Sequence, residues 1–240
     1  MTIDHTGCES YTKEYVQTNT ILADMAENKI GAFLKLKSID ENNTVLQDET
    51  HSITALTAIF SSINAEVGLN ITISNLTATV TGSSDLNADN YFIPASFVIP
   101  GKGTIEQRTL KVIRNNYFAP VTKTYDGTAT FTNFDLLRQY FTYKNSLSDP
   151  SELILEGDDV KIIISAANFG NEKYNSGTAT FISLTFGNGA NYLTGNSTHI
   201  QNYKFVGDDT LDLVGIGVIE RAALTVTPVT SGSPLSKKYD

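Results

Sequence analysis

The last 26 residues of the chain repeat a stretch that has already occurred once. Gly101-Lys-Gly-Thr-Ile-Glu-Gln-Arg-Thr-Leu-Lys-Val112 returns as Gly215-Ile-Gly-Val-Ile-Glu-Arg-Ala-Ala-Leu-Thr-Val226. The ungapped alignment of residues 101–126 with 215–240 holds 10 identities in 26 positions, whereas unrelated stretches would share roughly one or two. The offset is 114 residues (215 − 101). A chain that repeats itself at this spacing is predicted to contain tandem copies of one domain.

The repeat predicts where one unit ends and the next begins. Residues 1–10 are predicted to be a disordered leader or a cloning remnant, residues 11–116 to be repeat unit one, and residues 117–234 to be repeat unit two. Residues 235–240 repeat the start of unit two and are predicted to begin a third unit. Units of about 110 residues are long enough to bury a core of their own. The short, proline-containing linker over residues 114–120 is predicted to limit the motion between units.

Apolar and polar residues alternate in a way that predicts strands. Leu69, Ile71 and Ile73 alternate with polar residues within residues 68–81, and residues 177–186 are the counterpart in unit two. We therefore predict an all-β fold of two tandem β-sandwich-like (Ig-like) repeat domains with short helical insertions. Units of the β-grasp type are the alternative.

Each unit carries an insertion relative to the other. In residues 40–65, a short helix is predicted over residues 52–65, where apolar side chains have helical spacing. These side chains are Ile53, Leu56, Ile59, Phe60 and Ile63. The second insertion, residues 134–155, begins with an aromatic-rich stretch that is predicted to form one or two helical turns. A helix over residues 52–65 that packs across a sheet would favour the β-grasp alternative.

The two units are predicted to differ at their first turn and to agree at their last strand. Asp126-Gly127 favours a tight turn with positive φ, whereas Val16-Gln17 at the same place does not, so the turns should differ. The unit is predicted to close with an alternating strand, which contains Leu110 and Val112 in one copy. In the other copy that strand contains Leu224 and Val226.

The charge and the single cysteine exclude several classes of partner and site. The chain has 26 acidic and 17 basic residues, for a net charge of −9, which disfavours nucleic acid and anionic lipid as partners. No apolar run reaches transmembrane length, so no membrane insertion is expected. Cys8 is the only cysteine, which excludes an internal disulfide and a multi-cysteine zinc site. The chain is expected to be a monomer.

One loop carries oxygen ligands at alternate positions, as a calcium loop does. The calcium candidates are Asp85, Asn87 and Asp89. The aligned positions of unit two are Ser197, His199 and Gln201. A calcium site that the scaffold needs should be present in both copies, and this one is not. We therefore predict a solvated turn, with no metal and no cofactor.

No motif of a catalytic nucleophile or of a phosphate-binding loop occurs in the chain, so no enzymatic activity is expected. Tyr125 and Tyr203 are predicted to pack in the core. One aromatic cluster in the second insertion offers a binding surface for a glycan or a protein. The ligand-binding candidates are Phe134, Tyr140, Phe141 and Tyr143.

Several short motifs occur in an order that resembles a known repeat. Lys123-Thr-Tyr-Asp-Gly-Thr128, Glu156-Gly-Asp-Asp-Val160, and Asn202-Tyr203 followed by residues 217–226 resemble the YDG-type tandem repeats of large bacterial surface adhesins. These repeats are related to mucus-binding-protein-like repeats. The resemblance implies a non-enzymatic, extracellular module at the bacterial cell surface, which acts as a semi-rigid stalk or spacer. The alternative is an adhesive module whose inserted loops, residues 40–65 and 134–155, bind a host or neighbouring-cell glycan or protein.

Overall fold

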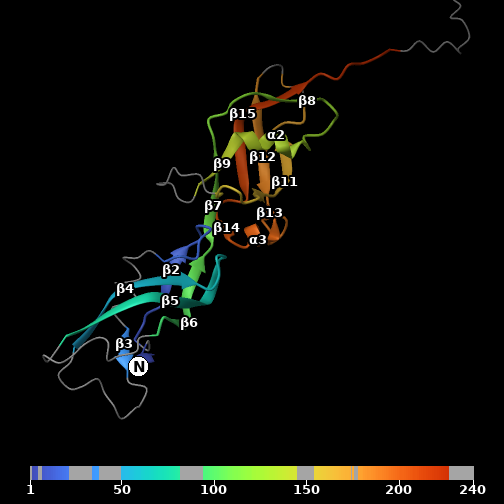
Figure 1. The fold of residues 1–240 in the computed structure, drawn as a ribbon. Coiled ribbons are helices and arrows are strands. Elements are labelled where there is room, and N and C mark those ends of the chain that lie inside the picture. The colour runs from blue at the N-terminus through green and yellow to red at the C-terminus, as the bar shows by residue number, and fades with distance from the viewer. Residues whose placement is uncertain are drawn as a thin grey trace, which may run out of the picture. The chain divides into compact units, whose positions relative to one another are not determined.

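The computed structural model describes residues 2–4, 7–21, 34–37, 50–81, 94–144, 154–173, 175 and 178–226. Strands dominate this part of the chain (Figure 1), which confirms the predicted all-β fold class. The sandwich-like arrangement stays a prediction. The described strands of the first half are β1 (Thr2–Asp4), β2 (Tyr11–Glu14), β3 (Lys35–Lys37), β4 (Thr50–Phe60), β5 (Glu66–Thr81), β6 (Ser96–Glu106) and β7 (Arg108–Arg114).

The described part of the second half contains further strands and three short helical segments. The strands are β8 (Val121–Thr124), β9 (Phe141–Lys144), β10 (Val160–Ile162), β11 (Ile164–Phe169), β12 (Thr180–Phe186), β13 (Leu193–Gly195), β14 (Tyr203–Phe205) and β15 (Thr210–Glu220). The helical segments are α2 (Phe134–Leu137), the 3₁₀ helix η4 (Arg138–Tyr140) and α3 (Ser197–Ile200). The predicted helical turns at the start of the second insertion are therefore confirmed. Asn133 caps α2 by accepting a hydrogen bond from the Leu136 N–H.

The chain divides into two compact units that do not follow the sequence repeat. The first unit contains Met1–Ile113, Tyr143–Ile163 and Gly187–Gly207, and the second contains Arg114–Thr142, Ile164–Phe186 and Asp208–Asp240. Two segments that the repeat assigns to unit two, residues 143–163 and 187–207, thus belong to the first compact unit.

The first unit is built around a four-stranded mixed sheet with the order β2-β6-β5-β4. Strands β4, β5 and β6 are antiparallel neighbours, whereas β2 lies parallel to β6, with Tyr11 opposite Gly103. This parallel pair joins the first and the last strand of the sheet.

The second unit repeats this sheet strand for strand. Its order is β8-β15-β12-β11, with β8 parallel to β15 and the other neighbours antiparallel. Val121 lies opposite Gly217, as Tyr11 lies opposite Gly103. The register also shifts at the same place in both sheets, between Leu69 and Ile71 in β5 and between Thr180 and Ile182 in β12. The sequence repeat is therefore a repeat of structure.

One glycine in each sheet allows a phenylalanine ring to cross the last strand. A Cβ atom on Gly103 would lie 2.5 Å from a ring atom of Phe60, and one on Gly217 would lie 2.9 Å from a ring atom of Phe169. Both phenylalanines are buried. The glycines that the alignment pairs are thus required by close packing in each copy.

Smaller sheets complete the first unit. Strand β14 lies parallel to β7 in a three-stranded sheet of order β14-β7-β9, and β10 pairs with β13. Strand β1 pairs with β3 through Ile3 and Leu36. Residues 2–4 therefore form a strand, and Cys8 is buried, which differs from the disordered leader that was predicted for residues 1–10.

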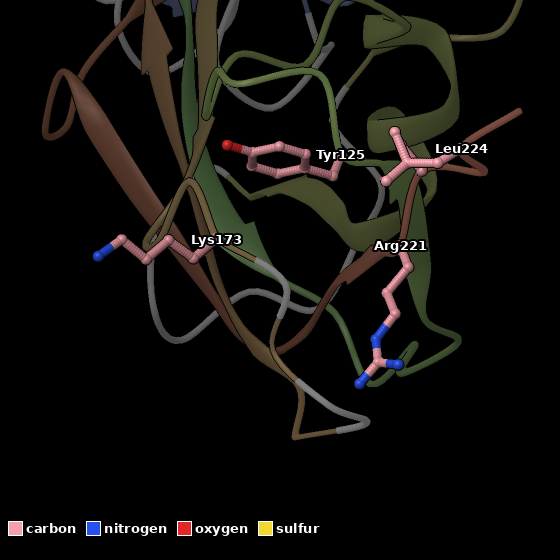
Figure 2. Close-up of a pocket in the computed structure, with 5 residues that line it drawn as sticks. Tyr125, Lys173, Arg221 and Leu224 are labelled. Carbon is pink, nitrogen blue, oxygen red and sulfur yellow. The ribbon is translucent and has the colours of Figure 1, made fainter. Parts of the chain in front are cut away.

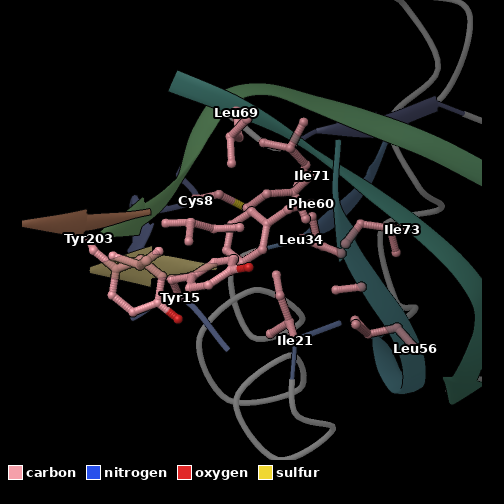
Figure 3. Packing of buried hydrophobic residues seen from close by; sticks show 14 of the residues in the cluster. Cys8, Tyr15, Ile21, Leu34, Leu56, Phe60, Leu69, Ile71, Ile73 and Tyr203 are labelled. Carbon is pink, nitrogen blue, oxygen red and sulfur yellow. The ribbon is translucent and has the colours of Figure 1, made fainter. Parts of the chain in front are cut away.

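The core of the first unit gathers side chains from the sheet and from the later segments (Figure 3). Phe60, Ile71 and Ile73 come from the sheet, while Val160 and Tyr203 come from beyond residue 143. The unit is therefore complete only when these later segments are in place.

The helix predicted over residues 52–65 is wrong, because strand β4 covers Thr50–Phe60. Leu56, Ala58 and Phe60 are buried, while Thr57 is half-buried and Ile59 is exposed, which is the two-residue period of a strand. The threonine and isoleucine content of this stretch favours a strand over a helix.

The predicted difference between the first turns of the two units is also wrong. Gln17 has a φ of 60° and Gly127 a φ of 85°, so both turns use the left-handed region. Glutamine is strained there by about 1–2 kcal/mol. Its side chain is held by a hydrogen bond from Gln17 Nε2 to the Glu156 carbonyl at 3.0 Å.

The predicted closing strand forms in only one copy. Residues 108–114 form β7, but the aligned residues 222–226, the described part of that stretch, adopt neither strand nor helix. Leu110 is fully buried, whereas Leu224 is 94% exposed. The two copies differ because β7 is hydrogen-bonded to a neighbouring strand, whereas residues 222–226 have no such neighbour within the described chain.

Within the same described residues, no helix has both the length and the apolar character that a membrane span requires.

Candidate functional site

Equivalent tyrosines follow the first strand of each sheet. The Tyr15 N–H donates to the Glu106 carbonyl at 3.0 Å, and the Tyr125 N–H donates to the Glu220 carbonyl at 2.8 Å. The two backbones are thus held alike, and any difference between the tyrosines arises from what covers them.

In the first unit, Tyr15 is covered and only 3% exposed. Its ring packs edge-on against Tyr203, with 5.7 Å between the ring centroids (Figure 3). Both phenols donate to the carboxylate of Asp158, over 3.5 Å from Tyr15 and 2.5 Å from Tyr203. The Tyr203 hydroxyl also accepts a hydrogen bond from the Leu155 N–H at 3.0 Å. An acidic turn and a strand from later in the chain therefore close over Tyr15.

The surroundings keep both phenols protonated. Burial is the main cause that raises the pKa of Tyr203 above its usual value, and the hydrogen bond to Asp158 raises it further. Burial and the charge of Asp158 likewise raise the pKa of Tyr15. These phenols act as hydrogen-bond donors and are poor proton acceptors at neutral pH.

His199 lies beside the carboxylate. The His199 Nδ1 atom accepts a hydrogen bond from the Asp159 N–H at 2.9 Å. The distance from Nδ1 to the Asp158 carboxylate is 3.9 Å. A hollow of about 370 Å³ adjoins these groups.

Asn202 joins the covering segment to the sheet and is fully buried. Its side-chain oxygen accepts from the Ala65 N–H at 2.7 Å, and its side-chain nitrogen donates to Asn64 Oδ1 at 3.1 Å and to the Thr198 carbonyl at 3.0 Å. The Asn202 carbonyl accepts from the Arg108 N–H at 2.8 Å. A buried amide satisfied on both sides fixes one geometry for the cover.

In the second unit, the tyrosine that corresponds to Tyr15 is open to solvent. Tyr125 is 44% exposed, which corrects the prediction that it packs in the core, whereas the same prediction for Tyr203 is confirmed. The side chains around Tyr125 line a hollow of about 520 Å³ (Figure 2). We name this hollow the Tyr125 surface, and its lining residues are Tyr125, Lys173, Arg221, Ala222 and Leu224.

A lysine at the same position braces the turn in both units. The Nζ atom of Lys13 donates to the carbonyls of Thr18 and Thr20, and that of Lys123 donates to the carbonyls of Thr128 and Thr130. The four distances lie between 2.6 and 3.0 Å. These lysines stabilise the turn that presents the tyrosine, so their role is structural.

The aspartate of the second turn adds a contact that the first turn lacks. Asp126 lies 2.8 Å from Lys123 Nζ and accepts from the Thr128 N–H and hydroxyl. The hydrogen bond from Lys123 is the main cause that lowers the pKa of Asp126 to about 2. Val16 occupies this place in the first unit.

A third hollow, of about 500 Å³, lies in the first unit. Tyr192 and Phe205 stack there with 4.8 Å between their centroids. The polar lining includes Gln107, Asn191 and Gln201. Such a mixture of aromatic and amide groups suits a polar ligand such as a sugar.

The calcium candidates predicted from the sequence, Asp85, Asn87 and Asp89, lie outside the described residues. Among the residues that are described, no three His, Cys, Asp or Glu side chains gather as a metal site.

The aromatic candidates do not form one exposed patch. Tyr140 is 1% and Phe141 is 5% exposed, and the Tyr140 hydroxyl donates to the Ala119 carbonyl at 2.7 Å. Tyr143 packs against the core of the first unit and accepts from the Ile162 N–H, and Phe134 is half-buried at the start of α2. Tyr140 and Phe141 are thus engaged in internal packing, which leaves them no face for a ligand.

The sequence reading missed the pairing of Tyr15 with Asp158 and Tyr203. The repeat aligns Tyr15 with Tyr125, but the acidic turn and Asn202-Tyr203 lie downstream of both tyrosines, so the sequence carries no signal that assigns them to Tyr15. Comparison with protein-family models, curated proteins and solved structures finds nothing that matches this chain.

Proposed function

We propose that this chain is a non-enzymatic repeat segment of a bacterial cell-surface or secreted adhesin, in which it acts as a semi-rigid stalk or spacer. The observation that carries the proposal is the parallel pairing of the first and last sheet strands in both repeats. A chain that enters and leaves a sheet along parallel neighbouring strands leaves at the end opposite to the one where it entered. Each repeat therefore advances the chain, as a spacer requires.

The same pairing suits a load that is applied along the chain. A pull on both ends of a repeat draws its two parallel strands past each other, so that the hydrogen bonds between them bear the load together. The load on the first unit falls on the pair β2–β6, and the load on the second falls on β8–β15. The net charge of −9 favours the solubility of such a segment.

Single-molecule stretching of the full chain, held at its two ends, tests the proposal. We expect two abrupt rupture events, one for each sheet. Lys123→Met removes the brace of one turn and should lower the rupture force of one event only, while the matched variant Lys13→Met should lower the other. Smooth extension at low force, without rupture events, would contradict a load-bearing role.

A second candidate function is direct adhesion to a glycan or protein of a host or neighbouring cell. The hollow beside Tyr192 and Phe205 supports it more than the inserted loops do, since Tyr140 and Phe141 are buried. Titration with soluble glycans, followed by the fluorescence of the chain's tyrosines, tests this candidate. A response that Tyr192→Ala abolishes would favour adhesion over a spacer role alone.

A further inference from the structure

The equivalent tyrosine surfaces of the two units differ in whether other parts of the chain cover them. In the first unit, Tyr15 is 3% exposed and Leu110 is fully buried. In the second unit, Tyr125 is 44%, Leu224 is 94% and Val226 is 89% exposed. Single exposed leucines are common in proteins. Here, however, Tyr125 and Leu224 are the copies of Tyr15 and Leu110, which are buried in the other repeat, and Val226 is the copy of the half-buried Val112.

The cover of the first surface is made of two segments. Strand β14 adds to β7 in parallel, with Phe205 opposite Leu110. The acidic turn places Asp158 against the hydroxyl of Tyr15. Together they supply a strand, a carboxylate and a tyrosine ring to the end of the sheet.

Both segments come from far downstream of the residues that they cover. Asp158 lies 143 residues after Tyr15 (158 − 15), and Tyr203 lies 188 residues after it (203 − 15). The same distances counted from Tyr125 lead beyond residue 240. Tyr239-Asp240 repeats Tyr125-Asp126, so the register of the repeat continues at these two residues.

We infer that the Tyr125 surface, together with residues 222–226, docks the next repeat of the same polypeptide. That repeat adds a strand beside residues 222–226, as β14 adds to β7, and places its acidic turn on Tyr125. This inference rests on the proposed function in one respect, which is that a further repeat follows.

Charge complementarity agrees with this occupant. Lys173 and Arg221 border the Tyr125 surface (Figure 2). The turn that covers Tyr15 carries three acidic residues, Glu156, Asp158 and Asp159. An equivalent turn would bring negative charge close to Lys173. Addition of a strand supplies main-chain hydrogen bonds whatever the side chains are.

A second molecule of this chain is a poor occupant, because its own covering segments are engaged. Its Tyr203 and Asp158 are already bonded within its first unit, and its Asn202 is fully satisfied. To dock elsewhere, they would have to leave a buried, hydrogen-bonded site.

The test extends the full chain by one repeat. Residues 127–240 are repeated after Asp240, where Tyr239-Asp240 already continues the register of Tyr125-Asp126. Amide hydrogen exchange is then compared at residues 222–226 in the original and extended chains. We expect exchange there to slow by about tenfold or more in the extended chain. Added in trans, a second molecule of the original chain should leave the exchange rate unchanged.

Disulfide trapping checks the register independently. In the extended chain with Cys8→Ala, Leu224→Cys is combined with Phe205→Cys in the appended copy, the pair that corresponds to Leu110 and Phe205. Rapid cross-linking of this pair is expected. The matched control uses Lys204→Cys in the appended copy, which shifts the register by one residue and turns the side chain to the other face.

Unchanged exchange at residues 222–226, or cross-linking that does not prefer the Phe205→Cys pair, overturns the inference. Slower exchange caused by a second molecule in trans also overturns it, because the occupant would then be a second copy. The stretching experiment reports on the parallel pairs β2–β6 and β8–β15. Its outcome is therefore independent of the hydrogen-exchange and cross-linking results.

Discussion

Truncation of one leucine in each copy of the repeat should have opposite consequences. Leu110 is fully buried in β7, while its counterpart Leu224 is 94% exposed. Leu110→Ala removes buried methyl groups and leaves a cavity, which costs about 2–5 kcal/mol of unfolding free energy. Leu224→Ala removes atoms that are already in water and should change that free energy by no more than about 0.5 kcal/mol.

Urea unfolding followed by far-UV circular dichroism measures this difference. With a urea dependence of about 1–3 kcal/mol per molar for a domain of this size, a loss of about 3 kcal/mol lowers the midpoint of the first unit by about 1 M or more. The transition of the second unit serves as an internal control, because it should keep its midpoint in Leu110→Ala.

Equal midpoint shifts in the two variants would refute the reasoning. They would mean that Leu224 is buried by a contact that the described residues do not contain, or that Leu110 is not part of the core. A shift for Leu110→Ala that corresponds to less than about 0.5 kcal/mol would refute it as well, since a fully buried leucine cannot be that neutral.

Three further predictions concern single groups. Tyr203→Phe removes a donor from the buried Asp158 carboxylate and should cost about 1–3 kcal/mol, measured by urea unfolding at pH 7. The raised pKa of Tyr203 stabilises the wild-type fold below the usual tyrosine pKa. That contribution should fade as the pH rises toward the folded-state pKa, and the variant should lack this alkaline loss. The lowered pKa of Asp126 stabilises the turn above the unfolded value of 3.8, and this contribution should disappear as the pH falls through about 2. Carboxyl NMR titration should show that pKa, and Lys123→Met should move it upward. Gly103→Ala places a Cβ atom against a buried ring and should destabilise the first unit by about 1–3 kcal/mol, as its thermal midpoint will show.

Each of these three has an outcome that would contradict it. If the Tyr203→Phe variant loses as much folding stability at alkaline pH as the wild type does, then Tyr203 is not the cause of that loss. An Asp126 pKa near 3.8 would mean that Lys123 does not contact it in solution. A neutral Gly103→Ala would show that the ring moves aside, and Gly101→Ala is not a suitable control there, because Gly101 has a φ of 66° and would be strained.

Short-range patterns in the sequence predicted strands well and mispredicted one helix. Alternation identified the strand that contains Ile71 and Ile73, since both are buried on one face of β5. A helix was predicted over residues 52–65 because the spacing of Leu56 and Phe60 fits a helix and a strand equally well. The β-branched residues between them decide in favour of the strand.

Turn chemistry was a weaker guide, because tertiary contacts outweighed local preference. Gln17 adopts the conformation that Gly127 adopts freely, and the hydrogen bond to the Glu156 carbonyl holds it there. A residue 139 positions away cannot be inferred from the turn itself. Local propensity therefore predicted a difference that the fold does not show.

The candidate site was the least predictable part. The alignment correctly paired Tyr15 with Tyr125, but nothing in either local sequence says that one is covered and the other is open. That difference depends on Asp158 and Tyr203, which lie more than 140 residues after Tyr15. Contacts over such separations leave no periodic signal, so only the structure reveals them.

The set of segments that make up the first unit also has a consequence for the order in which the chain folds. Because Gly187–Gly207 belongs to that unit, a polypeptide that emerges from the ribosome or from a secretion channel N-terminus first cannot finish its first unit until Gly207 has emerged. By then, most of the second sheet has already appeared, and only β15 is still to come. Contacts that close so late slow folding. Folding of the first unit thus lags behind the emergence of most of the second sheet.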